Sequence, residues 1–171
     1  MNTLLDFRAS KDEFFRKDPQ SPLTDEQKQG FKGLQYFPEN PALRLEVIIE
    51  EYSKKDTIEM QTSTGDTQVY ERFGRIHFRI EGQPVTLTIY TSDTGYFLPF
   101  VDSLAGKETY PAGRYLEPEP LGENRFRIDF NLAYNPYCAY NDLWSCPLTP
   151  FENRIKVPIP AGEKIFKTNN L

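Results

Sequence analysis

The sequence predicts a mainly β protein, an antiparallel barrel or sandwich of about eight strands with two short N-terminal helices and a long irregular segment packed on it. Three observations support this fold class. The chain contains 13 Phe and 10 Tyr, and aromatic side chains suit the half-buried surface of a sheet. Its 14 prolines interrupt helices and mark turns. From Leu43 onward, short runs of alternating apolar and polar residues follow one another without the rhythm of βαβ units.

Residues 1–33 carry the signals of two helices. Capping boxes are expected in the pairs Ser10–Glu13 and Thr24–Gln27, and Gly33 is expected to end the second helix. Pro19 and Pro22 lie between the two patterns, and proline does not fit a helix interior. We therefore predict two short helices that lie beside the sheet.

Residues 43–131 carry the antiparallel strands. The clearest hairpin is GRIHFRIEGQPVTLTIY, in which Ile76, Phe78 and Ile80 form one apolar face and a turn follows at once. Further strands are predicted in LRLEVIIEEY, DTIEMQTS, TQVYERF, YFLPFV, TYPAGRYLEP and NRFRIDFNL. A final short strand and a tail are predicted in 155–166.

The segment 132–154 has no regular period. It contains both cysteines, the only tryptophan and three tyrosines. We expect this segment to pack over one end or edge of the sheet, anchored by burial of its aromatic rings. Together these parts make one domain, 1–171, which is the usual outcome for a chain of this length.

Charge and composition limit the partners that we expect. A net charge of -5 without a basic cluster disfavours nucleic acid and anionic membranes. No apolar stretch approaches the roughly 20 residues that span a bilayer, and the start lacks a signal-peptide pattern, so we expect a cytoplasmic protein. We expect no cofactor and no metal, because the sequence has no glycine-rich phosphate motif and no clear metal-ligand spacing.

The two cysteines leave several interpretations open. Cys138 and Cys146 lie eight positions apart, so they are compatible with buried free thiols, a disulfide or zinc ligands. Cys138 is also a candidate nucleophile, for which His77 is the only histidine that could act as base. His77 alternates with Arg75 and Arg79 on the polar face of a strand, which favours a surface histidine instead.

Polar residues near the end of the last long strand suggest a site. Asp129 and Asn131 would line a pocket if their face turns inward; otherwise they are solvated or hold the following loop. Arg114 and Arg154 are candidates for holding an anionic ligand, and an internal ion pair is the alternative. Glu152 joins Asp129 as a candidate general acid or base.

Several phrases are shared with a known family. They are KDEFF, SPLT, FKGLQYFP, GKETYPAGRYL, DFNLAYNPYCAYNDLWSCPL and ENRIKVPIPAGE. The chain resembles DUF1684, a mainly bacterial family of unknown function, and the resemblance spans about residues 14–164. It implies no activity. Its signature residues here are Tyr110, Gly113, Arg114, Asp129, Asn131, Tyr134, Asn135, Pro136, Cys138, Cys146, Pro147, Glu152, Asn153, Arg154, Gly162 and Glu163.

The sequence is therefore consistent with three functions. The first is a soluble protein whose pocket binds a small polar or anionic ligand. The second is a hydrolase that uses Asp129 or Glu152, with Cys138 as a more distant alternative. The third is a structural or interaction protein in which the signature segment, residues 132–154, serves only as a folding plug. The residues expected to bind the ligand are Arg114, Asp129, Asn131, Tyr134, Asn135, Glu152, Asn153 and Arg154.

Overall fold

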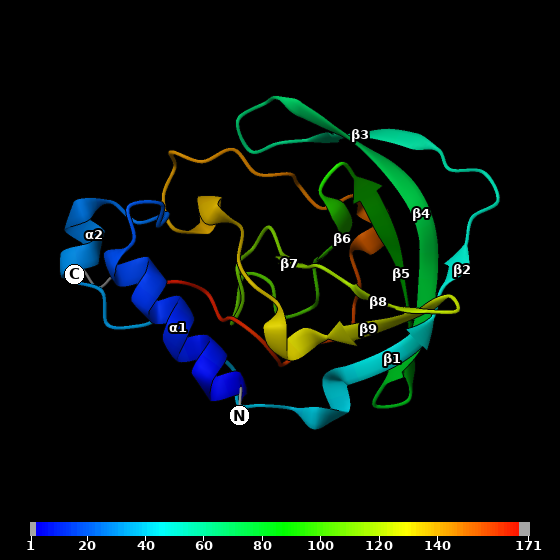
Figure 1. Ribbon diagram of the computed structural model, residues 1–171, viewed down its shortest axis with the longest axis horizontal. Coiled ribbons are helices and arrows are strands. Elements are labelled where there is room, and N and C mark those ends of the chain that lie inside the picture. The colour runs from blue at the N-terminus through cyan, green and yellow to red at the C-terminus, as the bar shows by residue number, and fades with distance from the viewer. Residues whose placement is uncertain (1–2, 168–171) are drawn as a thin grey trace.

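Two antiparallel sheets form the body of the protein in the computed structural model, which describes residues 3–167 (Figure 1). The smaller sheet has the order β1-β9-β8, with strands Arg44–Ile48, Arg125–Asp129 and Glu119–Gly122. The larger sheet has the order β2-β4-β5-β6-β7, and β3 also pairs with β4. Its strands are β2 Glu50–Glu51, β3 Thr57–Gln61, β4 Thr67–Ile80, β5 Gln83–Ser92, β6 Gly95–Phe100 and β7 Arg114–Leu116. The predicted mainly β, antiparallel class is confirmed.

The hairpin of β4 and β5 is the longest pairing in the larger sheet. Ile76 pairs with Leu87, and the two-residue turn consists of Glu81 and Gly82. Both turn residues have positive φ, 49° and 80°, which matches the tight turn that follows the right-handed twist of a hairpin. The alternation seen in the sequence therefore gives the correct register as well as the correct strands.

One apolar core joins the two sheets. Fully buried side chains come from both of them, including Ile76 and Leu87 of the larger sheet and Ile128 of the smaller sheet. The chain passes from one sheet to the other directly, because β1 and β2 are separated only by Ile49, which is also buried. The core accordingly sits between the sheets, and the helices are left outside it.

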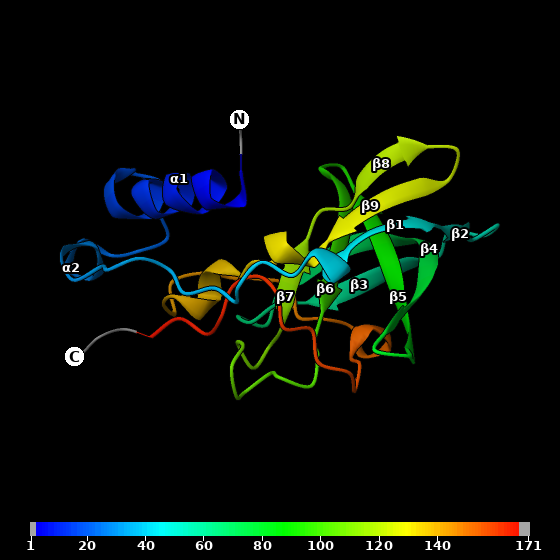
Figure 2. The ribbon, with the colours of Figure 1, turned by 90° about the horizontal axis from the view of Figure 1, so that it is seen from below.

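The helices lie to one side of the sheets in both views (Figures 1 and 2). Helix α1 spans Leu4–Lys17 and begins at a capping box of Thr3 and Asp6, so the predicted start at Ser10 is wrong. Residues 4–9 favour helix, and the earlier cap extends it over them. Helix α2, Asp25–Gln29, has the predicted capping box of Thr24 and Gln27 but ends at Gly30 rather than Gly33. Among the described residues, no helix is both long and apolar enough to cross a membrane.

The signature segment packs on the sheets as an irregular chain, as predicted. The short 3-10 turn η2, Phe130–Leu132, leads into this segment, and two more, η3 Tyr137–Ala139 and η4 Phe151–Asn153, lie within it. A further turn, η1 Pro41–Leu43, precedes β1. Isolated bridges attach it to the sheets, joining Tyr134 to Tyr115 and Pro147 to Thr62.

The predicted final strand in 155–166 is wrong. That segment carries only a single bridge, between Glu163 and Tyr36. Pro158 and Pro160 each remove a backbone donor, and the N–H of Ile159 donates to the carboxylate of Asp102 instead of to a neighbouring strand.

Candidate functional site

A cleft of about 590 Å³ separates α1 from the adjoining strands. A volume in this range is typical of small-molecule sites. The lining is mainly apolar and aromatic with a few charged groups, and consists of Phe7, Ser10, Lys11, Phe14, Phe15, Leu116, Glu117, Glu119, Arg127, Asp129, Leu132, Tyr134 and Tyr137. A hollow of about 600 Å³ lies elsewhere, along β3, β4 and β5, but its lining is predominantly polar.

One wall of the cleft is a single face of α1. Phe7, Lys11 and Phe14 are spaced four and three positions apart, which places their side chains on the same side of a helix. Phe7 is 42% exposed although it is a large apolar residue. The wall therefore presents aromatic surface that the protein itself does not cover.

The opposite wall comes from β7, η2 and the signature segment. Leu132, 39% exposed, supplies apolar surface, and the hydroxyl of Tyr134 donates to the carboxylate of Glu117. Burial, followed by the effect of Glu117, raises the pKa of Tyr134 above its usual value. The phenol is therefore held neutral and acts as a donor.

Lys11, the cation on the α1 wall of the cleft, is already paired with a carboxylate. The ammonium of Lys11 pairs with Glu163, whose side chain is only 1% exposed, and it lies 5.1 Å from the centre of the Tyr134 ring. The same carboxylate accepts hydrogen bonds from the hydroxyl of Tyr140 at 2.6 Å and from the backbone N–H of Asn135 at 3.3 Å. The charge of Lys11 is thus neutralised by a carboxylate that does not line the cleft.

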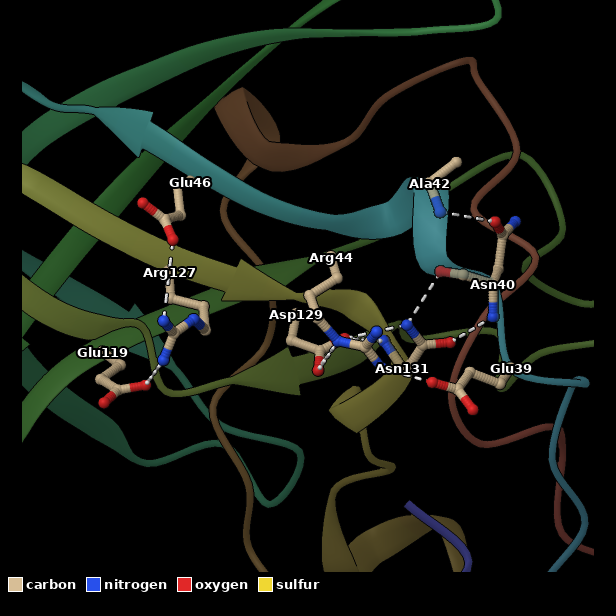
Figure 3. Close-up of polar contacts among 9 residues, drawn as sticks. All are labelled: Glu39, Asn40, Ala42, Arg44, Glu46, Glu119, Arg127, Asp129 and Asn131. Carbon is tan, nitrogen blue, oxygen red and sulfur yellow. Dashed lines mark hydrogen bonds and ion pairs between the residues drawn. The ribbon is translucent and has the colours of Figure 1, made fainter. Parts of the chain in front are cut away.

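Asp129 lies at the end of β9 within a polar network (Figure 3). Its carboxylate accepts from Nδ2 of Asn131 at 2.9 Å and from Nε of Arg44 at 3.1 Å. Asn131 in turn accepts from the N–H of Asn40 at 2.8 Å and donates to its carbonyl at 3.0 Å. This network fixes the chain that enters β1, so the nearby cleft wall is held by hydrogen bonds as well as by packing.

Arg127, the other cation that lines the cleft, is also paired with carboxylates. Its guanidinium lies between Glu46 and Glu119, with nitrogen–oxygen distances of 3.7 Å and 3.0 Å (Figure 3). Both cations that line the cleft are therefore paired with carboxylates, whereas Glu117 has only a neutral phenol as its partner among the described contacts.

The structure brings only two of the residues predicted to bind a ligand, Asp129 and Tyr134, to the cleft. Arg114 is 0% exposed, and its guanidinium donates to the backbone carbonyls of Ala161, Glu163 and Ile159. It also lies 3.6 Å from the buried carboxylate of Asp102. A ligand in the cleft does not reach this guanidinium in this conformation.

The three predicted asparagines are all buried, with at most 1% exposure. Asn131 binds the backbone of Asn40, and Asn135 donates to the carbonyl of Lys164 at 3.0 Å. Asn153 accepts from the N–H of Thr88 and donates to the carbonyls of Thr88 and Pro99, all at 2.8 Å. Each amide is used to satisfy backbone groups of another segment, which is the structural role expected of buried amides in an irregular chain.

Glu152 and Arg154 lie outside the cleft. Glu152 forms an ion pair of 2.6 Å with Arg72 and accepts from the hydroxyl of Tyr90; Arg154 is exposed. Burial alone would raise the pKa of Glu152, but hydrogen bonds from Arg72 and Tyr90 lower it below its usual value. A carboxyl held in its ionised state is poorly suited to act as a general acid.

The cysteines are free thiols that contact each other. The backbone N–H of Cys138 donates to Sγ of Cys146 at 3.3 Å. His77 instead contacts Thr86 at 2.9 Å and Glu50 at 3.5 Å, so it does not serve either thiol as a base. Within residues 3–167 no three His, Cys, Asp or Glu side chains gather into a potential metal site.

Sequence reasoning missed the helical wall of the cleft. Lys11, Phe7 and Phe14 belong to a helix that the sequence predicted only as lying beside the sheet. The available signal was the spacing of Phe7, Lys11 and Phe14 on one side of the helix, next to the buried Phe15, which also lines the cleft.

A smaller hollow of about 390 Å³ adjoins the cleft, because Glu117 and Tyr134 line both. Its aromatic lining is continuous: the ring of Tyr115 lies 5.9 Å from that of Tyr134 and 4.8 Å from that of Phe97. An aromatic surface thus leads from α1 past Tyr134 toward the larger sheet.

Comparison with known proteins gives a family and a fold but no activity. A family model described as "Protein of unknown function (DUF1684)" matches residues 29–164. An uncharacterized protein of Haloarcula marismortui, whose solution NMR structure is known, is 34% identical, with 94% of this chain and 91% of that chain covered and a TM-score of 0.71. No curated protein matches the chain.

Proposed function

This chain belongs to the DUF1684 family, whose function is unknown, and we propose that it binds a small amphipathic ligand in the cleft beneath α1. The observation that carries the proposal is an apolar cleft of about 590 Å³ with partly uncovered Phe7 and Leu132 on facing walls. Uncovered apolar surface in a concave site is favourably buried by an apolar ligand, at about 25 cal/mol per Å².

The charged groups favour a ligand head that donates hydrogen bonds. Lys11 is paired with Glu163, and Arg127 is paired with Glu46 and Glu119, so an anionic ligand would have to displace a carboxylate from either cation. Glu117 is exposed and, within residues 3–167, its carboxylate accepts only from Tyr134. A hydroxyl or amine at the ligand's polar end would use its remaining acceptor positions. The proposed ligand therefore has a neutral or cationic polar end, which differs from the polar or anionic ligand that the sequence predicted.

A structural role for the signature segment is supported by a separate observation. Arg114 and Asn153 are both 0% exposed, and their side chains bind backbone groups of segments far away in the sequence. In the proposed function Asn153 holds the signature segment against the larger sheet, Arg114 holds the C-terminal segment, and neither contacts the ligand. The two roles are compatible, since a site built on irregular chain needs a rigid support.

The experiment uses a fluorescent apolar probe, N-phenylnaphthylamine, with the wild-type protein and two matched tryptophan variants. Ser10→Trp places a bulky ring in the cleft, whereas Ala9→Trp places the same ring one position away on an exposed residue that does not line it. We expect the probe to bind wild type and Ala9→Trp alike and to lose at least tenfold in affinity for Ser10→Trp. Equal binding to both variants, with both folded by circular dichroism, would contradict the proposal.

The charge preference is tested by competition. A primary alkyl amine, alcohol and carboxylate of equal chain length are titrated against the bound probe. The amine and the alcohol are expected to displace the probe at lower concentration than the carboxylate, and Glu117→Gln is expected to reduce the advantage of the amine. A carboxylate that competes best would show that the paired cations are available to ligands and would overturn the head-group assignment.

A further inference from the structure

Cys138 and Cys146 form a pair of thiols, neither of which lines the proposed ligand-binding cleft. Cys138 lies in η3 and is partly exposed; Cys146 follows Trp144 and is only 7% exposed. The backbone N–H of Cys138 donates to Sγ of Cys146 at 3.3 Å, so the second sulfur lies against the main chain of the first cysteine. The two cysteines are therefore in direct contact while both are free thiols.

The sulfur of Cys138 has a donor beside it, because the hydroxyl of Tyr110 donates to it at 3.7 Å. On the other side of the pair, the hydroxyl of Ser63 donates to the carbonyl of Trp144 at 3.3 Å. Ser63 is fixed in turn, since its hydroxyl accepts the backbone N–H of Cys146 at 3.1 Å. Donors arranged around a sulfur stabilise its thiolate form, and the thiolate is the nucleophilic form of cysteine.

The two thiols have different pKa values, lowered for Cys138 and raised for Cys146. The hydrogen bond from Cys146, opposed by burial and assisted by Tyr110 and Ser63, lowers the pKa of Cys138 to about 6. The hydrogen bond to Cys138, together with burial, raises the pKa of Cys146. The other titratable groups that face this pair are Tyr110, Tyr115 and Asp142. The more exposed sulfur is therefore also the more nucleophilic one.

We propose that Cys138 and Cys146 are a redox-active dithiol in which Cys138 attacks a hydroperoxide and Cys146 resolves the product as a disulfide. In the first step the thiolate of Cys138 attacks the terminal peroxide oxygen; an S–O bond forms, the O–O bond breaks, and the leaving hydroxide or alkoxide takes up a proton. In the second step the sulfur of Cys146 attacks the sulfenic sulfur of Cys138, and its thiol proton leaves with the hydroxyl as water. The two thiols are oxidised by two electrons, and the peroxide is reduced.

The pair differs from a disulfide that is needed to hold a fold together. The reduced form is already hydrogen-bonded and packed, with Cys146 buried, so folding does not depend on the bond. A disulfide between Cys138 and Cys146 would close a loop of nine residues, and the tip of this loop at Leu143 is 78% exposed. An exposed tip allows the loop to adjust when the bond forms, and a dithiol reductant restores the two thiols.

The first test treats the reduced full chain with hydrogen peroxide and counts free thiols with a chromogenic disulfide. Wild type is expected to lose both thiols, to lose two hydrogen masses in intact mass spectrometry, and to recover fully with dithiothreitol. Cys146→Ser is expected to accumulate a sulfenic acid that dimedone traps at position 138. Cys138→Ser is expected to retain its remaining thiol. Two thiols that persist in folded wild type after peroxide treatment would overturn the proposal.

The second test measures the rate of iodoacetamide alkylation of Cys138 in the Cys146→Ala variant and in wild type across pH. For wild type the midpoint is expected at the lowered pKa of Cys138, about 6, compared with about 8.5 for an ordinary cysteine. Removing either donor, in Cys146→Ala or in Tyr110→Phe, is expected to move the midpoint upward, while Tyr70→Phe leaves it unchanged. A wild-type midpoint at the ordinary value would show that the donors do not activate the thiol and would overturn the assignment of Cys138 as attacking group.

Discussion

The ammonium of Lys11 pairs with the buried carboxylate of Glu163, and this contact ties the first helix to a segment 152 positions away in the sequence. Two further polar contacts hold the same helix: Arg8 donates to the carbonyl of Phe37 at 3.1 Å, and Asp12 accepts from the N–H of Leu34 at 2.9 Å. The position of α1, and with it one wall of the cleft, is therefore set by polar contacts and by the separate apolar cluster of Phe15, Leu23 and Tyr140, and not by the main apolar core.

Replacing Lys11 by methionine tests this attachment. The change leaves the carboxylate of Glu163 buried without its cation, and breaking a buried ion pair in this way costs about 3–5 kcal/mol. We expect urea unfolding at neutral pH to give a loss of that order. Lys17→Met, at a side chain that is 69% exposed, is the matched control and is expected to change stability by less than about 0.5 kcal/mol. The double variant Lys11→Met, Glu163→Gln should recover much of the loss; no recovery would show that the pair is not the cause.

Replacing Arg114 by lysine tests the role assigned to the signature arginine. Its guanidinium binds three carbonyls from different residues of the C-terminal segment, and an ammonium on a flexible chain does not reproduce that fork. Hydrogen bonds made by charged groups contribute about 1.5–3 kcal/mol each, so a loss of about 2–4 kcal/mol is expected from chemical denaturation. Arg154→Lys, at an exposed residue, should be nearly neutral. A stable Arg114→Lys protein with altered ligand binding would instead favour direct contact with a ligand.

The ion pair of Glu152 and Arg72 predicts a pH dependence. Because the pKa of Glu152 is lowered in the folded protein, this group adds stability above the pKa of the unfolded chain, and the added stability disappears as the pH falls through the folded pKa. Glu152→Gln is therefore expected to cost about 0.5–1 kcal/mol at pH near 7, allowing for the solvent exposure of the pair. Unfolding curves of wild type and variant should converge in acid. A constant difference down to acid pH would assign the effect to packing instead.

The sheets are predictable from the sequence because their side chains obey a local rule. In β4 and β5 the alternation of Ile76 and Leu87 with polar neighbours fixes which face is buried, and Gly82 supplies the positive φ that the turn requires. The C-terminal segment breaks the rule: Val157 and Ile159 alternate as in a strand, yet intervening prolines and the bond to Asp102 prevent pairing. In the C-terminal segment the alternation therefore indicates which side chains are buried, and it does not indicate a strand.

The candidate site is much less predictable, because its parts meet only through tertiary contacts. The signature motif marks residues such as Asn131 and Arg114 correctly as special, but their buried hydrogen bonds give them structural roles. Lys11 and Phe7, which line the cleft, lie in an ordinary amphipathic helix far from that motif. Nothing in the local sequence pairs position 11 with position 163, so the cleft emerges only when the helix is docked.

Asn153 offers the sharpest test of the buried amides. It connects η4 to β5 and β6 by accepting from one N–H and donating to two carbonyls. Asn153→Ala leaves these backbone groups without partners, for an expected loss of about 2–4 kcal/mol. Asn153→Asp is expected to cost more at neutral pH, because a carboxylate directs an acceptor at both carbonyls. Repulsion and burial raise the folded pKa of the introduced acid, so the stability of Asn153→Asp should fall as the pH rises above about 4, the unfolded value.

The measurement is urea unfolding of the two Asn153 variants at pH near 4 and near 7, compared with Phe151→Ala. Phe151 lies in the same turn but is 87% exposed, so its truncation should be nearly neutral at both pH values. The Asn153→Asp protein should approach the stability of Asn153→Ala, or exceed it, only at the lower pH, where the protonated acid can donate to one carbonyl. If the two variants keep the same relative stability at both pH values, the carbonyls of Thr88 and Pro99 do not control this position, and the strands must be held together by their ladder alone.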